Sequence, residues 1–145
     1  MSVVEESIII AKPRGEVFAF AADSTHYLDW VTTVIQLEAT PTGRFQADTT
    51  VKGVMRVAGR NLEWTAKMDE FQEGVVFGLR SVEAAMPFHY TYRFEDAAEG
   101  TRVTFRNELP PVGGLFGKLT EPVVVRVYSH GVKANLANLK ALLEA

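Results

Sequence analysis

Residues 45–109 show the clearest pattern in the chain, an alternation of apolar and polar side chains with a period of two. The alternating segments are 45–57, 62–69, 75–82, 88–95 and 102–109. Such alternation is typical of strands with one buried and one wet face, which form antiparallel sheets. Short turns at Glu73-Gly74 and Glu99-Gly100 separate neighbouring segments, so we expect successive strands to pair as hairpins.

A long amphipathic helix is predicted for Glu121–Glu144. At about 100° per residue, one side of this helix collects Val124, Tyr128, Val132, Leu136 and Leu139. About 24 residues at 1.5 Å per residue give a length of roughly 36 Å, enough to cross a small domain. Because the middle of the chain predicts strands, the natural partner of this apolar side is a sheet.

Two residues interrupt the apolar side of the predicted helix. Asn135 lies near its middle, where an unpaired amide would cost roughly 1–3 kcal/mol. Gly131 lies on the same side and costs about 1 kcal/mol relative to Ala in a helix. Two interpretations stay open: the helix packs tightly with Asn135 bonded to a strand or loop, or the two residues form part of a cavity wall.

The first forty residues predict a mixed arrangement of strands and helices. A strand is expected at Val3–Ala11, a helix opening at Pro13, a second short helix at Thr25–Val31 and a strand at Val34–Ala39. Tyr27 and Trp30 are three residues apart in the second helix, so both project from one face and could close one end of an interior.

Together these elements predict a single α+β domain spanning residues 1–145. We expect a curved, seven-stranded antiparallel sheet wrapped around the long C-terminal helix, with two short helices after the first strand. A sheet of seven strands is strongly twisted and tends to curl. Its inner face would be large and apolar, and a single helix need not fill it, so a ligand cavity is expected between the two.

Composition narrows the class of partner. The net charge is −3, which supplies no basic field for nucleic acid. No run approaches the ~18 apolar residues of a membrane span, so no integral membrane segment is expected. The chain has no cysteine and starts with an acidic segment unlike a signal peptide, so we expect a cytoplasmic protein. Homodimerisation is left open.

Several sequence segments carry a resemblance to a known family. They are Ile8-Ile9-Ile10-Ala11-Lys12-Pro13, Glu16-Val17-Phe18, Asp23 through Trp30, Tyr90-Thr91-Tyr92-Arg93-Phe94-Glu95, Gly100-Thr101-Arg102-Val103-Thr104 and Asn138 through Glu144. In these segments the chain resembles the START-like helix-grip superfamily (SRPBCC), and within it the polyketide cyclase/dehydrase-type proteins. The resemblance covers nearly the whole chain. It implies a deep cavity between the sheet and the last helix, used across the superfamily for lipids, sterols, polyketides and other apolar molecules.

Strand parity and helical phase select the side chains expected to line this cavity. The predicted ligand-binding residues are Trp30, Met55, Trp64, Phe77, Leu79, Tyr90, Tyr92, Phe105, Asn107, Phe116, Val124 and Tyr128. A large apolar surface with a few placed polar groups is the usual composition of a small-molecule pocket. It is also the composition of a solid core, and the sequence leaves that alternative open.

The same parity places nearly every ionisable strand residue on the wet face, which counts against catalysis. Ring closure or dehydration needs a base near the working pH and a donor for the developing oxyanion. Tyrosine, with a pKa near 10, is a reasonable donor but a poor base. His89 has wet-face parity, although a bulge at Pro87 could turn it inward, and Glu83 could lie at the rim. We expect no metal and no cofactor, and catalytic residues are not identified.

The sequence therefore favours binding or carriage of a small hydrophobic molecule of the lipid, polyketide or isoprenoid class. The alternatives are a polyketide or aromatic cyclase or dehydratase that uses the same cavity, and a protein-interaction module, which would need an exposed apolar patch. Entry is expected at the Gly113-Gly114 joint, with Phe116 as a lid.

Overall fold

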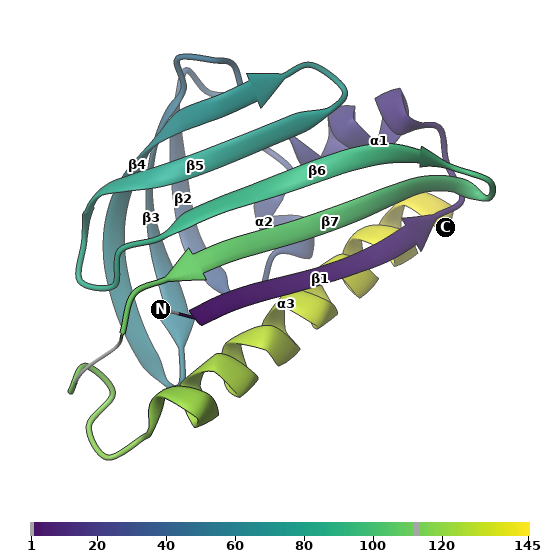
Figure 1. The fold of residues 1–145 in the computed structure, drawn as a ribbon. Helices are drawn as coiled ribbons and strands as arrows, with labels where there is room; N and C mark the ends of the chain where they lie inside the picture. The colour runs from purple at the N-terminus through teal and green to yellow at the C-terminus, as the bar shows by residue number, and fades with distance from the viewer. Residues whose placement is uncertain (1, 112–113) are drawn as a thin grey trace.

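The computed structural model describes residues 2–111 and 114–145 (Figure 1). Its elements, in chain order, are β1 (Ser2–Ile10), α1 (Arg14–Ala21), α2 (Tyr27–Trp30), β2 (Val34–Thr40), β3 (Thr50–Val57), β4 (Arg60–Gln72), β5 (Val76–Ala84), β6 (His89–Ala97), β7 (Gly100–Leu109) and α3 (Glu121–Glu144). This is the α+β arrangement that the sequence predicts, with two short helices after the first strand and one long C-terminal helix.

The strands form one seven-stranded sheet in the order β1-β7-β6-β5-β4-β3-β2, with every neighbouring pair antiparallel. Strands β2 to β7 follow one another as a meander, and β1 returns to pair with β7 along its whole length. Figure 1 shows the sheet curling so that β1 runs beside α3 while β2 and β3 lie behind it. The helix-grip architecture is therefore confirmed.

Hydrogen bonds attach α3 to the edge strand β1 from one end to the other. They join Ser2 to Glu121 (2.8 Å), Ser129 to Glu6 (2.8 Å), the Lys140 ammonium to the Ile9 carbonyl (2.6 Å) and the Ala11 N–H to Glu144 (2.8 Å). The helix is thus held against one edge of the sheet, and its apolar side faces the sheet interior.

The segment between α2 and β2 is clamped onto α3 by the two unusual residues of the helix. The Asn135 side-chain oxygen accepts hydrogen bonds from the Thr32 N–H (2.8 Å) and hydroxyl (2.9 Å), and its NH₂ group donates to the Thr33 hydroxyl (2.9 Å). A Cβ at Gly131 would lie 2.6 Å from the Thr33 methyl group. Tight packing, the first of the two interpretations, is therefore the one observed.

Several strand boundaries differ from the prediction by one to three residues, and the start of β3 differs by five. The alternation starts at Phe45, but β3 begins at Thr50. The Phe45 N–H donates to the carbonyl of Ala22 (2.7 Å), and the Gln46 N–H donates to the Thr49 hydroxyl (2.8 Å). These bonds direct residues 45–49 toward the end of α1 and into a turn, so the apolar Phe45 is buried without joining the sheet.

Strands β5 and β6 separate part-way along their length. Their pairing covers Val76 to Arg80, and beyond this β5 continues beside β4 only, with Glu83 opposite Thr65. At the branch, the Ser81 N–H donates to the Phe88 carbonyl (3.0 Å), and the Phe88 N–H donates to the Ser81 hydroxyl (2.9 Å). The connection 85–88 therefore projects Phe88 into the interior.

Candidate ligand-binding site

All twelve predicted ligand-binding residues are buried. Each exposes at most 6% of its surface, and together they come from α2, α3, five strands and the connection before α3. Strand parity and helical phase therefore identified the inward side chains correctly. That these side chains bind a ligand stays a prediction.

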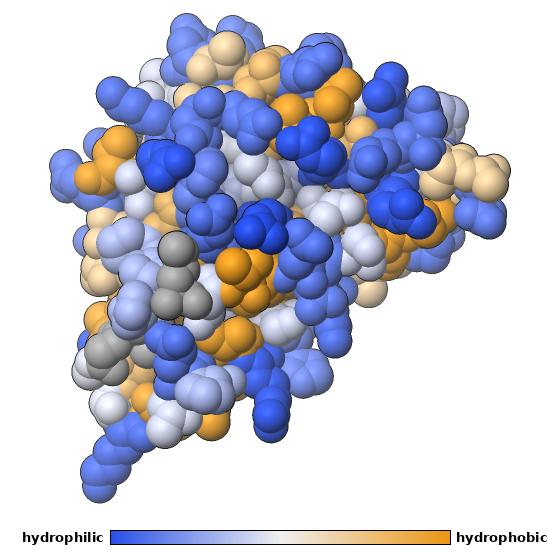
Figure 2. All heavy atoms as spheres, in the orientation of Figure 1, coloured by the Kyte–Doolittle hydropathy of each residue, from blue (hydrophilic) through white to orange (hydrophobic). Residues whose placement is uncertain are grey.

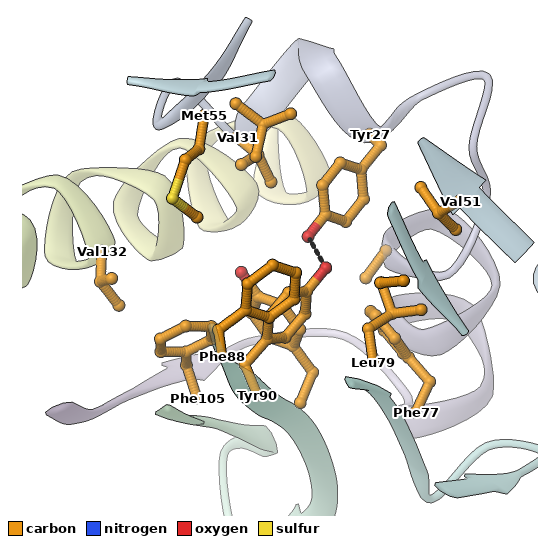
Figure 3. Close-up of a cluster of buried hydrophobic side chains, with 14 of the residues drawn as sticks. Tyr27, Val31, Val51, Met55, Phe77, Leu79, Phe88, Tyr90, Phe105 and Val132 are labelled. Atoms are coloured by element: carbon orange, nitrogen blue, oxygen red, sulfur yellow. Dashed lines mark hydrogen bonds between the residues drawn. The ribbon is translucent and has the colours of Figure 1, made fainter. Parts of the chain in front are cut away.

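Aromatic rings occupy the region between the sheet and α3. One run of neighbouring rings crosses the interior from Phe45 to Phe77 (centroids 5.3 Å apart), Tyr92 (5.1 Å), Phe105 (4.8 Å) and Tyr128 on α3 (6.4 Å). A second run joins Trp64 to Phe88 (5.2 Å), Tyr90 (5.5 Å) and Phe105 (5.6 Å). Packed aromatic rings thus occupy much of the region where the sequence led us to expect an open cavity (Figure 3).

Three hollows among the described residues lie elsewhere. The first, of about 610 Å³, spans β2 to β5 and has Glu38, Lys52, Glu63 and Glu83 along its lining. Another, of about 600 Å³, adjoins it, and a third of about 430 Å³ lies where β5 and β6 separate. A register shift between Thr65 and Ala66 sets Glu83 opposite the outward-facing Thr65, so Glu83, expected at the rim of an inner cavity, belongs to the outer face.

The outer face of the sheet is polar. Figure 2 shows a largely hydrophilic surface over the strands nearest the viewer, broken by small separate apolar patches. His89 belongs to this face: its Nε2 lies 3.1 Å from an Asp69 oxygen, without the alignment of a hydrogen bond, and its Nδ1 lies 3.3 Å from the Arg80 guanidinium. The histidine does not turn inward, because it keeps the regular register of β6 opposite Arg80 and Glu108.

All four tyrosines of the chain gather in the interior. The hydroxyls of Tyr27 and Tyr90 lie 3.0 Å apart, and Figure 3 shows Tyr27 reaching from α2 toward Tyr90 in the sheet. The side-chain NH₂ group of Asn107 donates to the hydroxyl of Tyr128 (2.9 Å). The predicted set omitted Tyr27, although its spacing from Trp30 already indicated that both side chains share one face.

Burial keeps these tyrosines in their neutral form. It raises the pKa of Tyr27 to about 12, and it raises the pKa of Tyr90 and of Tyr92 well above 10. The pKa of Tyr128 is raised as well, because burial outweighs the opposing hydrogen bond from Asn107. At neutral pH the interior therefore presents hydroxyl groups and no phenolate.

Three buried polar atoms of this region have no hydrogen-bond partner among the described residues. They are the side-chain oxygen of Asn107 and the indole N–H groups of Trp30 and Trp64. An unsatisfied buried polar group costs about 1–3 kcal/mol, and such groups are rare in folded proteins. The interior thus holds one acceptor and two donors with unused hydrogen-bonding capacity.

The buried polar side chains of the described residues are all neutral. They are Thr49, Thr101, Asn107 and Asn135, together with the four tyrosines and the two tryptophans. Within residues 2–111 and 114–145, no three histidine, aspartate or glutamate side chains cluster in a way that could hold a metal ion. The arrangement can donate and accept hydrogen bonds, but it contains no buried group suited to take up a proton at neutral pH.

A comparison with family models gives one match that spans almost the whole chain. Residues 1–144 match the family described as polyketide cyclase/dehydrase and lipid transport. The chain belongs to this family. Membership agrees with the resemblance noted in the sequence, and it implies either binding of a small hydrophobic ligand or polyketide cyclase activity.

Solved structures with the fold of this polyketide cyclase/dehydrase family member cover it end to end. The TTHA0849 protein of Thermus thermophilus has a TM-score of 0.82 at 22% identity, over 97% of this chain and 95% of that one. The Zhui aromatase/cyclase of a Streptomyces species has a TM-score of 0.76 at 21% identity, over 99% and 93%. A START superfamily protein of Mycobacterium smegmatis has a TM-score of 0.75 at 9% identity, over 98% and 97%. At these identities the likeness establishes the fold alone.

No curated protein matches this family member. Among its described residues, no helix combines the length and the apolar character that crossing a membrane requires. The cytoplasmic location stays a prediction, and whether the protein forms a homodimer stays open.

Proposed function

We propose that this protein binds and carries a small, mainly apolar molecule between the sheet and α3. The observation that supports this proposal is the unused hydrogen-bonding capacity of Asn107 and Trp30 inside an otherwise apolar, aromatic interior. A core that served packing alone would gain stability by replacing these groups with apolar ones. A role in orienting a bound ligand explains why these polar groups are present in the interior.

Desolvation supplies the affinity in this proposal. Each CH₂ group of the ligand that leaves water contributes about 0.8 kcal/mol. The rings of Phe88 and Phe116 come from connecting segments, so they can swing aside without breaking strand pairing. Phe116, in the connection before α3, exposes only 6% of its surface and belongs to the hydrophobic core, so in this proposal it acts as the lid. The proposed hinge at Gly113-Gly114 includes Gly113, which lies outside the described residues.

Native mass spectrometry of freshly purified protein, followed by solvent extraction, tests for a retained molecule. An uncharged fluorescent probe, N-phenyl-1-naphthylamine, then measures binding to the emptied protein. We expect Phe105→Ala, which enlarges the interior, to change probe affinity severalfold, because an apolar void accepts apolar guests. The control Val82→Ala, at a side chain that is 54% exposed on the sheet, should leave the affinity unchanged.

Two results would count against the proposed site. One is a protein that retains no molecule and does not bind the probe. The other is binding that responds to Thr65→Leu in the outer hollow and not to Phe105→Ala, because it would place the ligand on the wet face of the sheet.

A cyclase or dehydratase acting in the same interior is the second candidate. The observation that favours it is the excess of donors, since the Trp30 N–H and the tyrosine hydroxyls could stabilise a developing oxyanion. The absence of a charged side chain among the buried described residues counts against it. Conversion of an added poly-β-ketone thioester, followed by mass spectrometry, would separate this activity from carriage.

The third hypothesis, a protein-interaction module, requires an exposed apolar patch. Three apolar residues expose 42%, 42% and 45% of their surfaces: Leu119 in the connection just before α3, and Val123 and Val127 in the first half of α3. These exposed side chains are apolar, as an interaction patch requires. No described feature indicates what would cover it, so it does not displace the first proposal.

A further inference from the structure

We infer that the ligand is uncharged and carries a hydroxyl group that donates a hydrogen bond to the side-chain oxygen of Asn107, and that carboxylates are rejected at neutral pH. This inference rests on the proposed function, because it names the class of molecule that the same interior accepts.

The position of Asn107 makes it the polar anchor of the interior. It lies on β7, opposite Tyr90 of β6 on one side and Val4 of β1 on the other, and its side chain is completely buried. Its NH₂ group is engaged by the hydroxyl of Tyr128 on α3 (2.9 Å). The amide is therefore held between two elements, and its oxygen accepts no hydrogen bond from the described residues.

A hydroxyl is the ligand group that best matches this oxygen. An amide oxygen only accepts hydrogen bonds, so its partner must be a donor. Charged donors such as ammonium groups would be buried here without a carboxylate among the fully buried residues. A neutral hydroxyl supplies the donor without adding a charge. Trp30, whose N–H is also unpaired, offers a complementary site for a ligand carbonyl or ether oxygen.

The charges around the interior oppose an anionic ligand. The groups that face Asn107 from β6 and α3 are the neutral tyrosines Tyr90 and Tyr128. Two residues along β1 from Val4, Glu6 accepts a hydrogen bond from Ser129 of α3 (2.8 Å), so the nearby seam carries a carboxylate. A buried carboxylate on the ligand would thus lack a positive partner and lie near a negative one. Such a group binds well only after protonation.

Four probes that share one ring system test this inference on the full-length protein. They are naphthalene, 2-naphthol, 2-methoxynaphthalene and 2-naphthoate, each measured by isothermal titration calorimetry. We expect 2-naphthol to bind about tenfold more tightly than naphthalene, the usual effect of pairing one buried acceptor. The methoxy compound, which cannot donate, should not share this gain. At pH 7.5, 2-naphthoate should bind more weakly than naphthalene and should gain affinity as the pH falls below about 5.

The variant Asn107→Leu tests the named residue. In this variant 2-naphthol and naphthalene should bind with about equal affinity. The exposed control Asn61→Leu should keep the tighter binding of 2-naphthol. If Asn107→Leu does not fold, the comparison between 2-naphthol and 2-methoxynaphthalene in the unaltered protein tests the same hydrogen bond.

The outcomes separate this inference from the proposed function. If naphthalene binds but 2-naphthol binds no more tightly, the hydroxyl inference fails and apolar binding stands. If 2-methoxynaphthalene binds more tightly than 2-naphthol, the amide presents its NH₂ donor to the ligand, and the inference is overturned. Equal binding of 2-naphthoate and naphthalene at pH 7.5 would overturn the rejection of carboxylates. If none of the neutral probes binds, both proposals fail.

Discussion

The hydroxyl oxygens of Tyr27 and Tyr90 lie 3.0 Å apart in the interior, although 63 positions separate the two residues in the chain. This contact joins α2 to the start of β6. Both side chains are buried, so water competes little for this hydrogen bond. It connects the short helix that closes one end of the interior to the sheet that forms its wall.

The Tyr27–Tyr90 contact predicts a measurable coupling. Tyr27→Phe and Tyr90→Phe each remove one hydroxyl, and each should lower the free energy of unfolding by about 1 kcal/mol. The double variant should cost less than the sum of the two, because the second hydroxyl has lost its partner. Urea denaturation of the four proteins measures this cycle. Strict additivity would mean that the two hydroxyls do not interact in solution.

Alkaline pH should unfold the protein through its tyrosines. Burial raises the pKa of Tyr27 from 10.0 to about 12, so the folded state disfavours the phenolate form relative to the unfolded state. The resulting stability is complete below pH 10 and is lost as the pH rises toward 12. Tyrosinate absorbance should therefore appear together with loss of circular dichroism. A tyrosine that titrates near pH 10 while the protein remains folded would contradict this expectation.

The ring of Trp64 packs so closely against β3 that position 53 should require glycine. The two residues face each other across β3 and β4, and a Cβ at Gly53 would lie 2.4–2.9 Å from three atoms of the indole ring. Gly53→Ala should displace Trp64, shift the tryptophan emission and lower the free energy of unfolding by about 1–3 kcal/mol. The control is Gly15→Ala in α1, where a Cβ meets no atom within 4 Å and stability should be unchanged or slightly higher.

The methyl group of Thr33 packs so closely against α3 that position 131 should require glycine. Helix propensity alone favours Gly131→Ala by about 1 kcal/mol. The new Cβ would lie 2.6 Å from the Thr33 methyl, so we expect a net loss of stability in thermal denaturation. Thr33→Ser removes that methyl but keeps the hydroxyl that accepts from Asn135, so it should restore much of the loss. If Gly131→Ala proved stabilising on its own, the close approach of the two segments would be absent in solution.

Much of the fold follows from local pattern. The alternation in residues 62–69 and 102–109 predicts which side chains of β4 and β7 face inward, and Trp64 and Asn107 are buried accordingly. A strand places successive side chains on opposite faces, so parity carries this information without knowledge of the partner strand. Pattern failed at Phe45, whose side chain is buried by contacts with α2 and β5 while its backbone lies outside the sheet.

The candidate site depended more strongly on long-range packing. Periodicity placed Asn135 and Gly131 on the buried side of α3, but it could not distinguish a clamp on Thr32 and Thr33 from a cavity wall. The two arrangements have the same local sequence and differ only in how closely the α2–β2 segment approaches the helix.

The chain's own pattern was enough to establish seven antiparallel strands around one long amphipathic helix, because backbone geometry converts residue spacing directly into buried and exposed faces. Spacing contains no information about how far a sheet curls or how rings from separate strands share a volume. The convergence of four tyrosine side chains, the pairing of Asn107 with Tyr128 and the packing of aromatic rings in the interior all arise from that curvature. Those features emerged from contacts between residues far apart in the chain.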